Sequence, residues 1–284
     1  MFSDLQMKVA SEAAVMAMHA EMAKINDFTH NFQELEGKKG DAIAVPVINL
    51  SAGGNFDETS NNYATASNEV DGMLVNLNKH IVKSVTVTDR ELAATDFNWL
   101  RDMVYAETEV IGRMLNKQVF GLVGADEVKL SATLDTSSKT AVASLYATAA
   151  DNDINVYDSI LVLDPTNYAK VLGLIGDYNI YGGVDAVRAG RLPGLFGFKS
   201  VICSTFLPEG VKGAIIARDA IGIVSRYLEP MGGAYPATWK ASDDNGFTIG
   251  FRGFADLATG RRYLACESLY GTKILDAKRI VKLV

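Results

Sequence analysis

The feature that most constrains the fold is a long alternating stretch at residues 73–88, MLVNLNKHIVKSVTVT. Its apolar side chains all fall on odd positions: Met73, Val75, Leu77, Ile81, Val85 and Val87. Lys79 and Lys83 share that face, while polar side chains dominate the other. Successive side chains of a β-strand point to opposite faces, so the pattern predicts one extended strand. At roughly 3.3 Å per residue it would span about 50 Å, far more than a usual strand of about five or six residues.

A second strand is predicted just before it, over residues 41–49. Pro46 has no N–H to donate to a neighbour, which indicates that this strand lies at a sheet edge or contains a break. The segment between the two strands, residues 51–71, is small, polar and acidic and cannot bury much apolar surface. We therefore predict a long two-stranded arm with an acidic tip. Because an isolated hairpin of that length is only marginally stable, its apolar face requires a cover outside its own domain, which indicates assembly.

The longest helical pattern runs from Asp96 to Gly124. Its apolar residues recur at spacings of three, four and seven and share one face: Phe97, Leu100, Val104, Ile111, Leu115 and Leu122. Thr95 or Asp96 can cap its start, and Gly124 suits a left-handed residue at its end. Glu109 and Arg113 stand four apart in the order that stabilises a helix. The pattern predicts a rod of roughly 40 Å.

The rest of the chain predicts elements around this rod. Residues 4–26 predict an amphipathic helix whose alanines permit close packing. The middle of the chain resembles a compact α/β unit, with helices predicted over 138–150 and 166–175 and strands over 159–164, 198–203, 214–218 and 221–226. Residues 247–258 and 261–269 predict an antiparallel hairpin that turns at Thr259-Gly260.

Composition excludes several classes of protein. Hydrophobic residues make up 48% and charged residues 21% of the chain, which is typical of a protein with a folded core. The net charge is −7 and no run of lysine or arginine occurs, which argues against a protein that reads nucleic acid through phosphate contacts. No basic segment precedes an apolar core as in a signal peptide, and no run of about 18 apolar residues predicts a membrane span.

Motifs for chemistry are also missing. The sequence has no phosphate-binding glycine loop, no zinc-protease motif and no nucleophile elbow. His19, His30 and His80 are scattered, and Cys203 and Cys266 lack metal-binding spacing. Ser138 is interpreted as a helix N-cap rather than a nucleophile. We predict no catalytic residue, no cofactor-binding residue and no metal site, and therefore no enzyme.

Four segments carry a family resemblance. KHIVKSVTVTDRELAATD precedes the long helix, and SILVLDPTNYAKVLGL is similar to a strand–loop–helix segment of the form LVLDPxxYxxLL. GRLPGLFGFKSVICSTFLP and AIIARDAIGIVSR follow in the expected order. In this order the chain resembles the major capsid protein of tailed phages, the Hong Kong ninety-seven type of shell protein.

The resemblance implies an α+β capsid fold with an N-terminal arm, an extended E-loop hairpin, a long spine helix in a peripheral (P) domain, and an α/β axial (A) domain. The implied parts are residues 1–40 for the N-terminal arm and helix, 41–90 for the E-loop, 91–136 for the P domain with its spine helix, 137–242 for the A domain, and 243–284 for the return into the P domain. In the family the E-loop lies across a neighbouring subunit. The charged residues of the E-loop are therefore the candidate inter-subunit contacts: Asp57, Glu58, Glu69, Asp71, Lys79 and Lys83.

The implied function is structural. Such a chain self-assembles as a homo-oligomer into hexamers and pentamers of an icosahedral head that encloses double-stranded DNA. The implied partners are a separate scaffolding protein, a portal, and a packaged genome held without sequence-specific binding, with no membrane. The location is the virion, assembled in the host cytoplasm. The alternative is an encapsulin-type shell, a cellular compartment that shares this fold and encloses cargo proteins.

Overall fold

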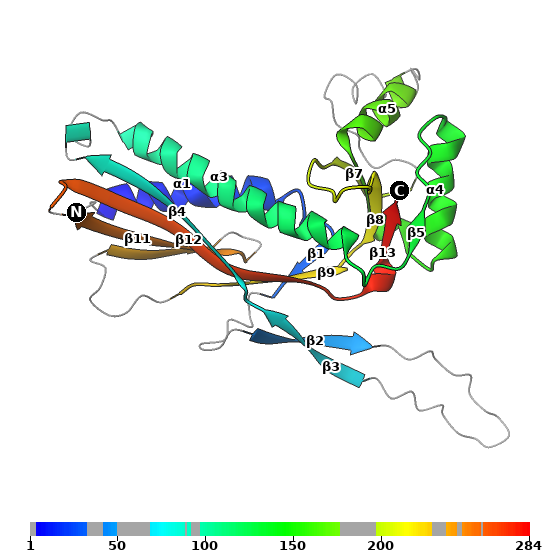
Figure 1. Cartoon of the computed structure of the whole chain (residues 1–284), viewed down its shortest axis with the longest axis horizontal. Helices are drawn as coiled ribbons and strands as arrows, with labels where there is room; N and C mark the ends of the chain where they lie inside the picture. Colours follow the sequence, from blue (N-terminus) through cyan, green and yellow to red (C-terminus); the bar gives the residue numbers. More distant parts are fainter. Residues whose placement is uncertain are drawn as a thin grey trace.

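The computed structural model describes residues 4–32, 42–49, 69–88, 90–91, 97–176, 197–228, 237–242, 246–256 and 258–284. The described elements form three groups (Figure 1). Two long helices cover one face of a six-stranded sheet, a five-stranded sheet with two shorter helices lies at one end, and a two-stranded hairpin projects from the side of the large sheet away from the long helices.

The large sheet and its helices form the body of the molecule. Its helices are α1 (Asp4–Met22) and α3 (Phe97–Gly121). Its strands are β1 (Thr29–Asn31), β4 (Lys79–Thr88), β9 (Ile221–Arg226), β10 (Ala237–Ser242), β11 (Thr248–Asp256) and β12 (Arg261–Ile274). The strand order is β1-β9-β12-β11-β10, and β4 also pairs with β12. The predicted hairpin of β11 and β12 is confirmed, and it turns through Gly260 at φ +61.

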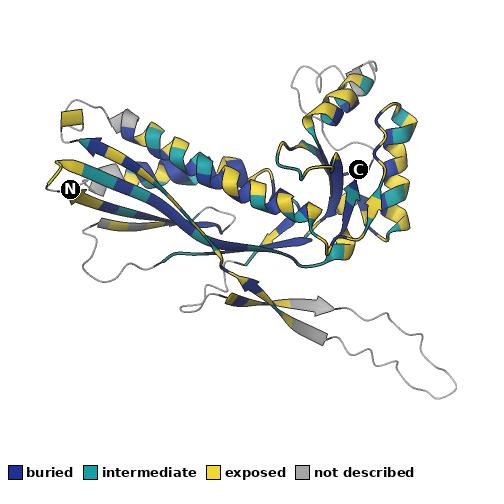
Figure 2. Cartoon of the chain, in the orientation of Figure 1, coloured by how far each residue is buried: buried dark blue, intermediate teal, exposed yellow. Residues whose placement is uncertain are grey.

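Helix α3 confirms the predicted rod, and its predicted inner face is buried. Leu100, Val104, Ile111 and Leu115 are all buried against the body (Figure 2). Its start at Thr95 and Asp96 lies outside the described residues. The predicted left-handed end at Gly124 is wrong, since this glycine closes a short 3-10 helix, η2 (Leu122–Gly124). A Cβ on Gly124 would come within 2.8 Å of the ring of Pro208, so close approach explains the glycine.

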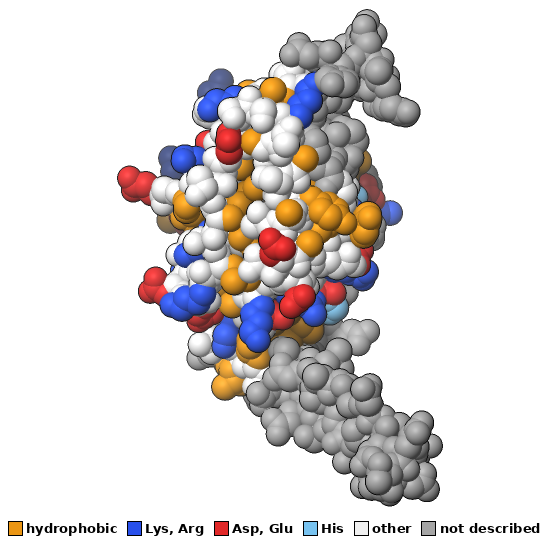
Figure 3. Space-filling view, turned by 90° about the vertical axis from the view of Figure 1, so that its right-hand side faces the viewer, with side chains coloured by type: hydrophobic (Ala, Val, Ile, Leu, Met, Phe, Trp, Pro, Cys, Tyr) orange, Lys and Arg blue, Asp and Glu red, His pale blue; other side chains and the backbone are white. Residues whose placement is uncertain are grey.

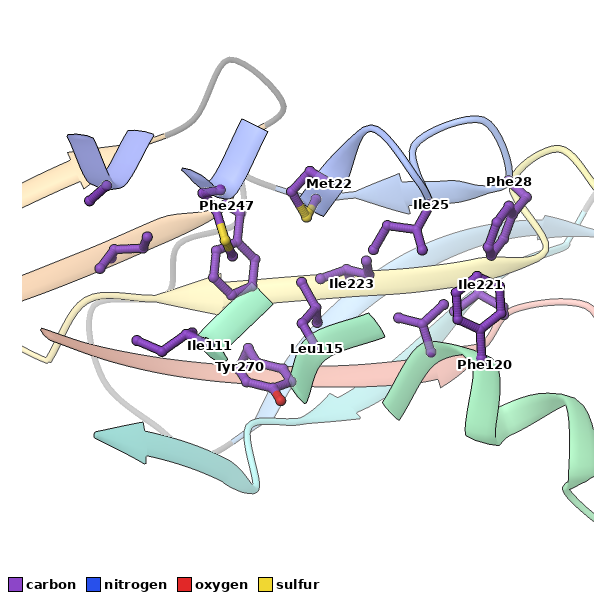
Figure 4. Close-up of a cluster of buried hydrophobic side chains, with 14 of the residues drawn as sticks. Met22, Ile25, Phe28, Ile111, Leu115, Phe120, Ile221, Ile223, Phe247 and Tyr270 are labelled. Carbon is purple, nitrogen blue, oxygen red and sulfur yellow. The ribbon is translucent and has the colours of Figure 1, made fainter. Parts of the chain in front are cut away.

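Helix α1 packs closely along α3. Its buried face carries small alanines, as the sequence predicts. Where the two helices meet, a Cβ on Gly112 would lie 2.6 Å from the Glu21 Cβ, so the contact requires glycine there. Figure 4 shows the core beneath, where Ile111 and Leu115 of α3 point toward Tyr270 of β12 and Phe247. This core fixes the two helices to the sheet.

The five-stranded sheet is buried on both faces. Its strands are β5 (Ser131–Ala132), β6 (Ser159–Leu163), β7 (Ser200–Cys203), β8 (Gly213–Ala217) and β13 (Ile280–Leu283), in the order β5-β13-β8-β6-β7. Ile160 and Val162 face the core of the body, while Leu161 and Leu163 face α4 (Lys139–Asp151) and α5 (Pro165–Gly176). Burial on both faces explains the continuous apolar run of β6. The predicted cap is confirmed, since the Ala141 N–H donates to Ser138 Oγ at 3.1 Å.

One predicted strand lies in a different sheet from the one expected, and two strands were not predicted. Strand β9 (Ile221–Arg226) was expected in the α/β unit but lies in the large sheet. Residues 237–242, at the end of the predicted A domain, form β10 of the large sheet, and β13 at the end of the chain joins the five-stranded sheet. The reason is long-range pairing, because β9 pairs with the far end of β12 at Leu269–Ile274, about 45 residues further along the chain.

The alternating stretch is two strands rather than one. It divides between β3 (Glu69–Asn76) and β4, and only β3 pairs with β2 (Ala42–Asn49) in the two-stranded hairpin. Strand β4 instead pairs with β12 along its whole length, from Lys79 opposite Tyr270 to Thr88 opposite Arg261. The predicted arm is therefore wrong from residue 79 onward. The strand that pairs with β4 comes from the last part of the chain. Local alternation cannot identify such a distant partner.

Candidate assembly surfaces

The described part of the arm packs onto its own body. Ile43, Val45 and Val75 form the inner face of the β2–β3 hairpin, Leu77 follows just after β3, and all four are 0–7% exposed. They cluster with Val224 of β9 and with partly buried side chains of the large sheet. The prediction that this apolar face lacks a cover in its own chain is therefore wrong for the arm base. The arm base is therefore packed on the body of its own chain.

Backbone contacts hold the arm base against β12. Gly271 lies where the arm crosses that strand, and a Cβ there would come 2.2 Å from the carbonyl oxygen of Asn76. Next to this crossing, Lys273 Nζ donates a hydrogen bond to the Leu74 carbonyl at 3.1 Å. A main-chain oxygen cannot move aside as a flexible side chain can, so the crossing tolerates only glycine. Sequence reasoning missed it, although a glycine inside a long strand is a known sign of close approach.

The outer face of the arm base is exposed and partly apolar. Ala42, Ala44 and Pro46 of β2 are exposed, and Leu74 of β3 is 57% exposed. On β4, Val82 is 49% exposed. Isolated exposed apolar side chains are common on soluble proteins, but Ala42, Ala44, Pro46 and Leu74 share one face of the hairpin. This face is a candidate contact surface for another molecule.

The structure separates the six predicted contact residues. Asp57 and Glu58 lie outside the described residues. Glu69 and Asp71 are at the far end of β3, opposite Asn49 and Val47 of β2, and their side chains are not described.

Lys79 and Lys83 lie on β4 and not on the hairpin, opposite Tyr270 and Cys266 of β12. Both side chains are half-buried, because they share the inner face of the strand with its apolar residues. Their predicted place on the arm is therefore wrong, while their contact with another subunit stays a prediction.

A buried Arg–Glu ion pair, with a histidine beside it, links three strands near the arm base. Glu267 of β12 is 4% exposed, and its carboxylate lies 2.5 Å from Arg252 Nε of β11. The other oxygen of that carboxylate is 3.3 Å from His80 Nε2 of β4. Breaking such a pair on one side leaves a buried charge without compensation, which is strongly destabilising. These contacts help to hold β4, the strand that follows the arm, on the large sheet. Sequence reasoning missed them because His80 and Glu267 are 187 positions apart.

The end of the molecule at the five-stranded sheet is a second candidate surface. Figure 3 looks onto this end, where apolar side chains gather across the middle of the face between charged ones. In this part of the chain Tyr157 is 69% exposed, Tyr146 is 38% exposed and Val284 is 43% exposed. Tyrosines with exposed rings are common at protein interfaces. This end is therefore also suited to contact another protein.

The described residues offer no arrangement for metal chemistry. In the described ranges, no group of three or more histidine, cysteine, aspartate or glutamate side chains is placed to hold a metal ion. Cys266 is buried, and its burial, with the charge of Glu107, raises the pKa of the thiol to about 12. Burial and the nearby Asp164 also raise the pKa of the exposed Cys203 thiol. Neither thiol has the lowered pKa of a reactive cysteine.

Among the described helices, none has both the length and the apolar character needed to cross a bilayer.

Comparison with solved structures identifies the fold. The chain is similar to the capsid structure of cyanophage P-SCSP1u, with TM-score 0.60 and 13% identity over 90% of this chain and 85% of that one. It is similar to the capsid of Ralstonia phage GP4, with TM-score 0.53 and 11% identity over 88% and 85%. It also resembles the virus-like particle from Pyrococcus furiosus, with TM-score 0.55 and 13% identity over 96% of each chain. No family profile matches the sequence, nor does any curated protein. The chain has the fold of phage capsid proteins.

Proposed function

We propose that this chain is a structural major capsid protein that self-assembles into hexamers and pentamers of an icosahedral phage head around double-stranded DNA. The observation that carries the proposal is the likeness to phage capsid chains over about nine-tenths of this chain. A likeness of that extent supports a role for the whole chain rather than for one part of it. In this proposal the β2–β3 hairpin is the base of the E-loop and α3 is the spine helix.

The shape of the chain supports a head-to-tail assembly. The hairpin leaves the body on the side of the large sheet opposite α1 and α3 (Figure 1). If the arm of one copy contacts the helix side of the next, the two contacting surfaces differ. Such heterologous contacts repeat from copy to copy and close into rings when the rotation allows, as hexamers and pentamers require. The body acts as one rigid unit in this proposal, because one continuous hydrophobic core joins its helices to both sheets.

The remaining parts of the proposal follow the resemblance to the family. A separate scaffolding protein and a portal are the proposed partners, and the genome inside the shell is held without sequence-specific contacts. The net charge of −7 supports weak rather than specific contact with DNA. Assembly takes place in the host cytoplasm, and the product is the virion shell. The proposed chain is not an enzyme.

An encapsulin-type compartment is the second candidate. The observation that favours it is the similarity to the Pyrococcus furiosus virus-like particle, which covers 96% of both chains. The two candidates predict the same subunit contacts but different contents. Particles purified from the native source would contain long double-stranded DNA in the first case and a folded cargo protein in the second.

The test of the proposal is electron microscopy of the overexpressed chain, alone and together with its scaffolding partner. We expect closed icosahedral particles that sediment far faster than a 30.6 kDa monomer. A monodisperse monomer under both conditions would contradict the proposal. Particles from the native source are then treated with nuclease, and their contents are analysed by electrophoresis and mass spectrometry. Long protected double-stranded DNA indicates the phage head, and a folded cargo protein indicates the cargo compartment.

A further inference from the structure

A groove of about 520 Å³ lies between the second half of α3 and residues 202–206, a segment that begins in β7 (Figure 1). Apolar side chains line both walls, with Val110 and Met114 on α3 and Phe206 on the other segment. Met114 is 40% exposed, and Val110 and Phe206 are half-buried, so this apolar surface is open to another molecule. The volume lies within the range of about 300–1,000 Å³ that is usual for small-molecule sites.

The charged side chains that line the groove are all cations. They are Lys24, Arg113 and Lys117, and no aspartate or glutamate of the described residues lines it. Glu21 lies 2.5 Å from Lys24, and Glu109 lies 2.6 Å from Arg113, so these two cations are compensated. Lys117 is exposed, and in the described ranges no carboxylate pairs with it. A ligand with one negative charge beside Lys117 is therefore favoured.

Several polar groups of the groove wall are already paired within the chain. The Ser204 N–H donates to the Leu163 carbonyl at 3.0 Å, and the Ser204 hydroxyl accepts from the Phe206 N–H at 3.2 Å. On the opposite wall, Asn116 Nδ2 donates to Glu21 Oε2 at 2.7 Å. A peptide in the groove would need partners for its own N–H and C=O groups, whereas a hydrocarbon chain needs only apolar contact. These pairings favour a ligand that is apolar apart from one charged end.

We propose that the groove binds a free long-chain carboxylate, with its hydrocarbon chain along Val110, Met114 and Phe206 and its carboxylate beside Lys117. Apolar contact supplies most of the affinity, and the charge-assisted hydrogen bond to Lys117 orients the ligand. The groove is a recess between two elements, so it admits a single chain rather than the surface of a bilayer. This binding needs one subunit only and goes beyond the proposed shell function.

Calorimetric titration of the unassembled full chain with dodecanoate, kept below its micelle concentration, tests the ligand class. We expect saturable binding at a single site on each chain. Dodecyltrimethylammonium has the same hydrocarbon chain with the opposite charge, and it should bind on the order of tenfold more weakly because only the carboxylate pairs with the groove's cations. Equal affinity for the two probes, or no saturable binding of dodecanoate, would contradict the proposal.

Substitutions locate the site. Lys117→Gln should lower the affinity for dodecanoate on the order of tenfold and leave that for dodecyltrimethylammonium unchanged, while Met114→Gln should weaken both. Arg101→Gln is the matched control, since it removes an exposed charge of α3 outside the groove and should change neither affinity. Thermal melts should stay within a few degrees of the unmodified chain, because all three side chains are exposed. Unchanged dodecanoate binding by folded Lys117→Gln would show that the site is elsewhere.

Thiol labelling gives an independent readout, because the exposed Cys203 also lines the groove. Saturating dodecanoate should slow the labelling of Cys203 by a maleimide severalfold, and an unchanged rate would contradict occupancy of the groove.

Two other occupants have their own outcomes. Sedimentation of the chain with phosphatidylcholine vesicles that contain oleate would indicate a membrane surface instead. Binding of a double-stranded oligonucleotide that Lys117→Gln abolishes would indicate nucleic acid. Either result would overturn the proposal. Particles that form normally from a chain without dodecanoate binding would refute this inference alone, and dodecanoate binding by a chain that never assembles would refute the shell function alone.

Discussion

Strands β3 and β4 continue one alternating sequence, yet they have different roles. In both, odd-numbered residues such as Val75 and Val87 are buried and even-numbered residues such as Leu74 and Val82 are exposed. Strand β4 pairs with β12 over its whole length, whereas among the described strands β3 pairs only with β2. Alternation therefore reports that one face is covered. It does not report whether the strand belongs to a sheet in the body or to an arm that leaves it.

Because β4 belongs to the body and β3 to the arm, we expect substitutions in the body and in the arm to change different properties of the protein. The body includes the large sheet, α1 and α3, whose core is continuous with one face of the five-stranded sheet. The arm base has its own small cluster around Val75 and Val224. A substitution in the first should abolish folding, while a change in the arm should act on assembly. The following variants test that separation.

The largest effect is expected from Ile111→Asp in the body. Ile111 is 0% exposed on the inner face of α3, so the substitution buries an unpaired charge and should cost more than about 4 kcal/mol. We expect loss of the cooperative thermal transition. Ala106→Asp on the exposed face of α3 is the matched control and should melt nearly as the unmodified chain does. A normal thermal transition of the Ile111→Asp variant would show that Ile111 does not lie on the buried face of α3.

Deletion of residues 51–71 should separate folding from assembly. We expect the body to keep its cooperative melt, because its described core contains no residue from this segment. Particle formation should be lost, since the proposed contact between copies is gone. Circular dichroism and sedimentation velocity measure the two properties on one sample. Loss of the melt would instead make the segment part of the folding core.

A smaller effect is expected where the arm crosses the body. Gly271→Ala would place a Cβ 2.2 Å from the Asn76 carbonyl oxygen, so the arm base must shift at a cost of about 1–3 kcal/mol. Gly72→Ala in β3 is the matched control, because a Cβ there meets nothing within 4 Å. The control should be neutral or slightly stabilising. Equal melting temperatures for the two variants would show that the arm does not cross β12 at Gly271.

The smallest effect is a pH dependence at the end of β4 away from the arm. The N–H and hydroxyl of Thr88 donate to the Glu91 carboxylate at 2.9 Å and 2.8 Å and lower its pKa below 4.5. A lowered pKa means that the native state releases this proton more easily than the unfolded chain. The stabilisation is therefore present above pH 4.5 and is lost as pH falls through the lowered pKa.

Melting curves over that pH range test the point. Glu91→Gln should show a weaker fall of melting temperature with acid than the unmodified chain, because the titrating group is gone. Glu127→Gln, which changes an exposed carboxylate after α3, should leave the fall unchanged. An identical acid dependence in all three proteins would contradict the capping role of Glu91.

Local patterns predicted much of the secondary structure. The apolar stripe of α3, the cap at Ser138 and the turn at Gly260 depend on neighbouring residues, and each was predicted correctly. The grouping of strands was not, because β4 and β9 pair with β12 from the last part of the chain. Pairing partners at such separations leave no local trace in one sequence.

The candidate surfaces were less predictable. The acidic segment 51–71 is visible as composition, but Gly271 and the Glu267 cluster have a role only through the residues that the fold brings beside them. A glycine in a strand has many explanations until its neighbours are known. Surfaces that depend on contacts between distant segments of the chain could therefore not be predicted from the sequence.

The most direct measurement is a cryo-electron microscopy map of particles formed by the full chain, detailed enough to trace the arm. The proposal predicts that the segment between β2 and β3 of each subunit extends from the hairpin onto the α3 side of the next subunit around the ring. Density for the arm folded back on its own body, or particles whose subunits meet without the arm, would contradict it.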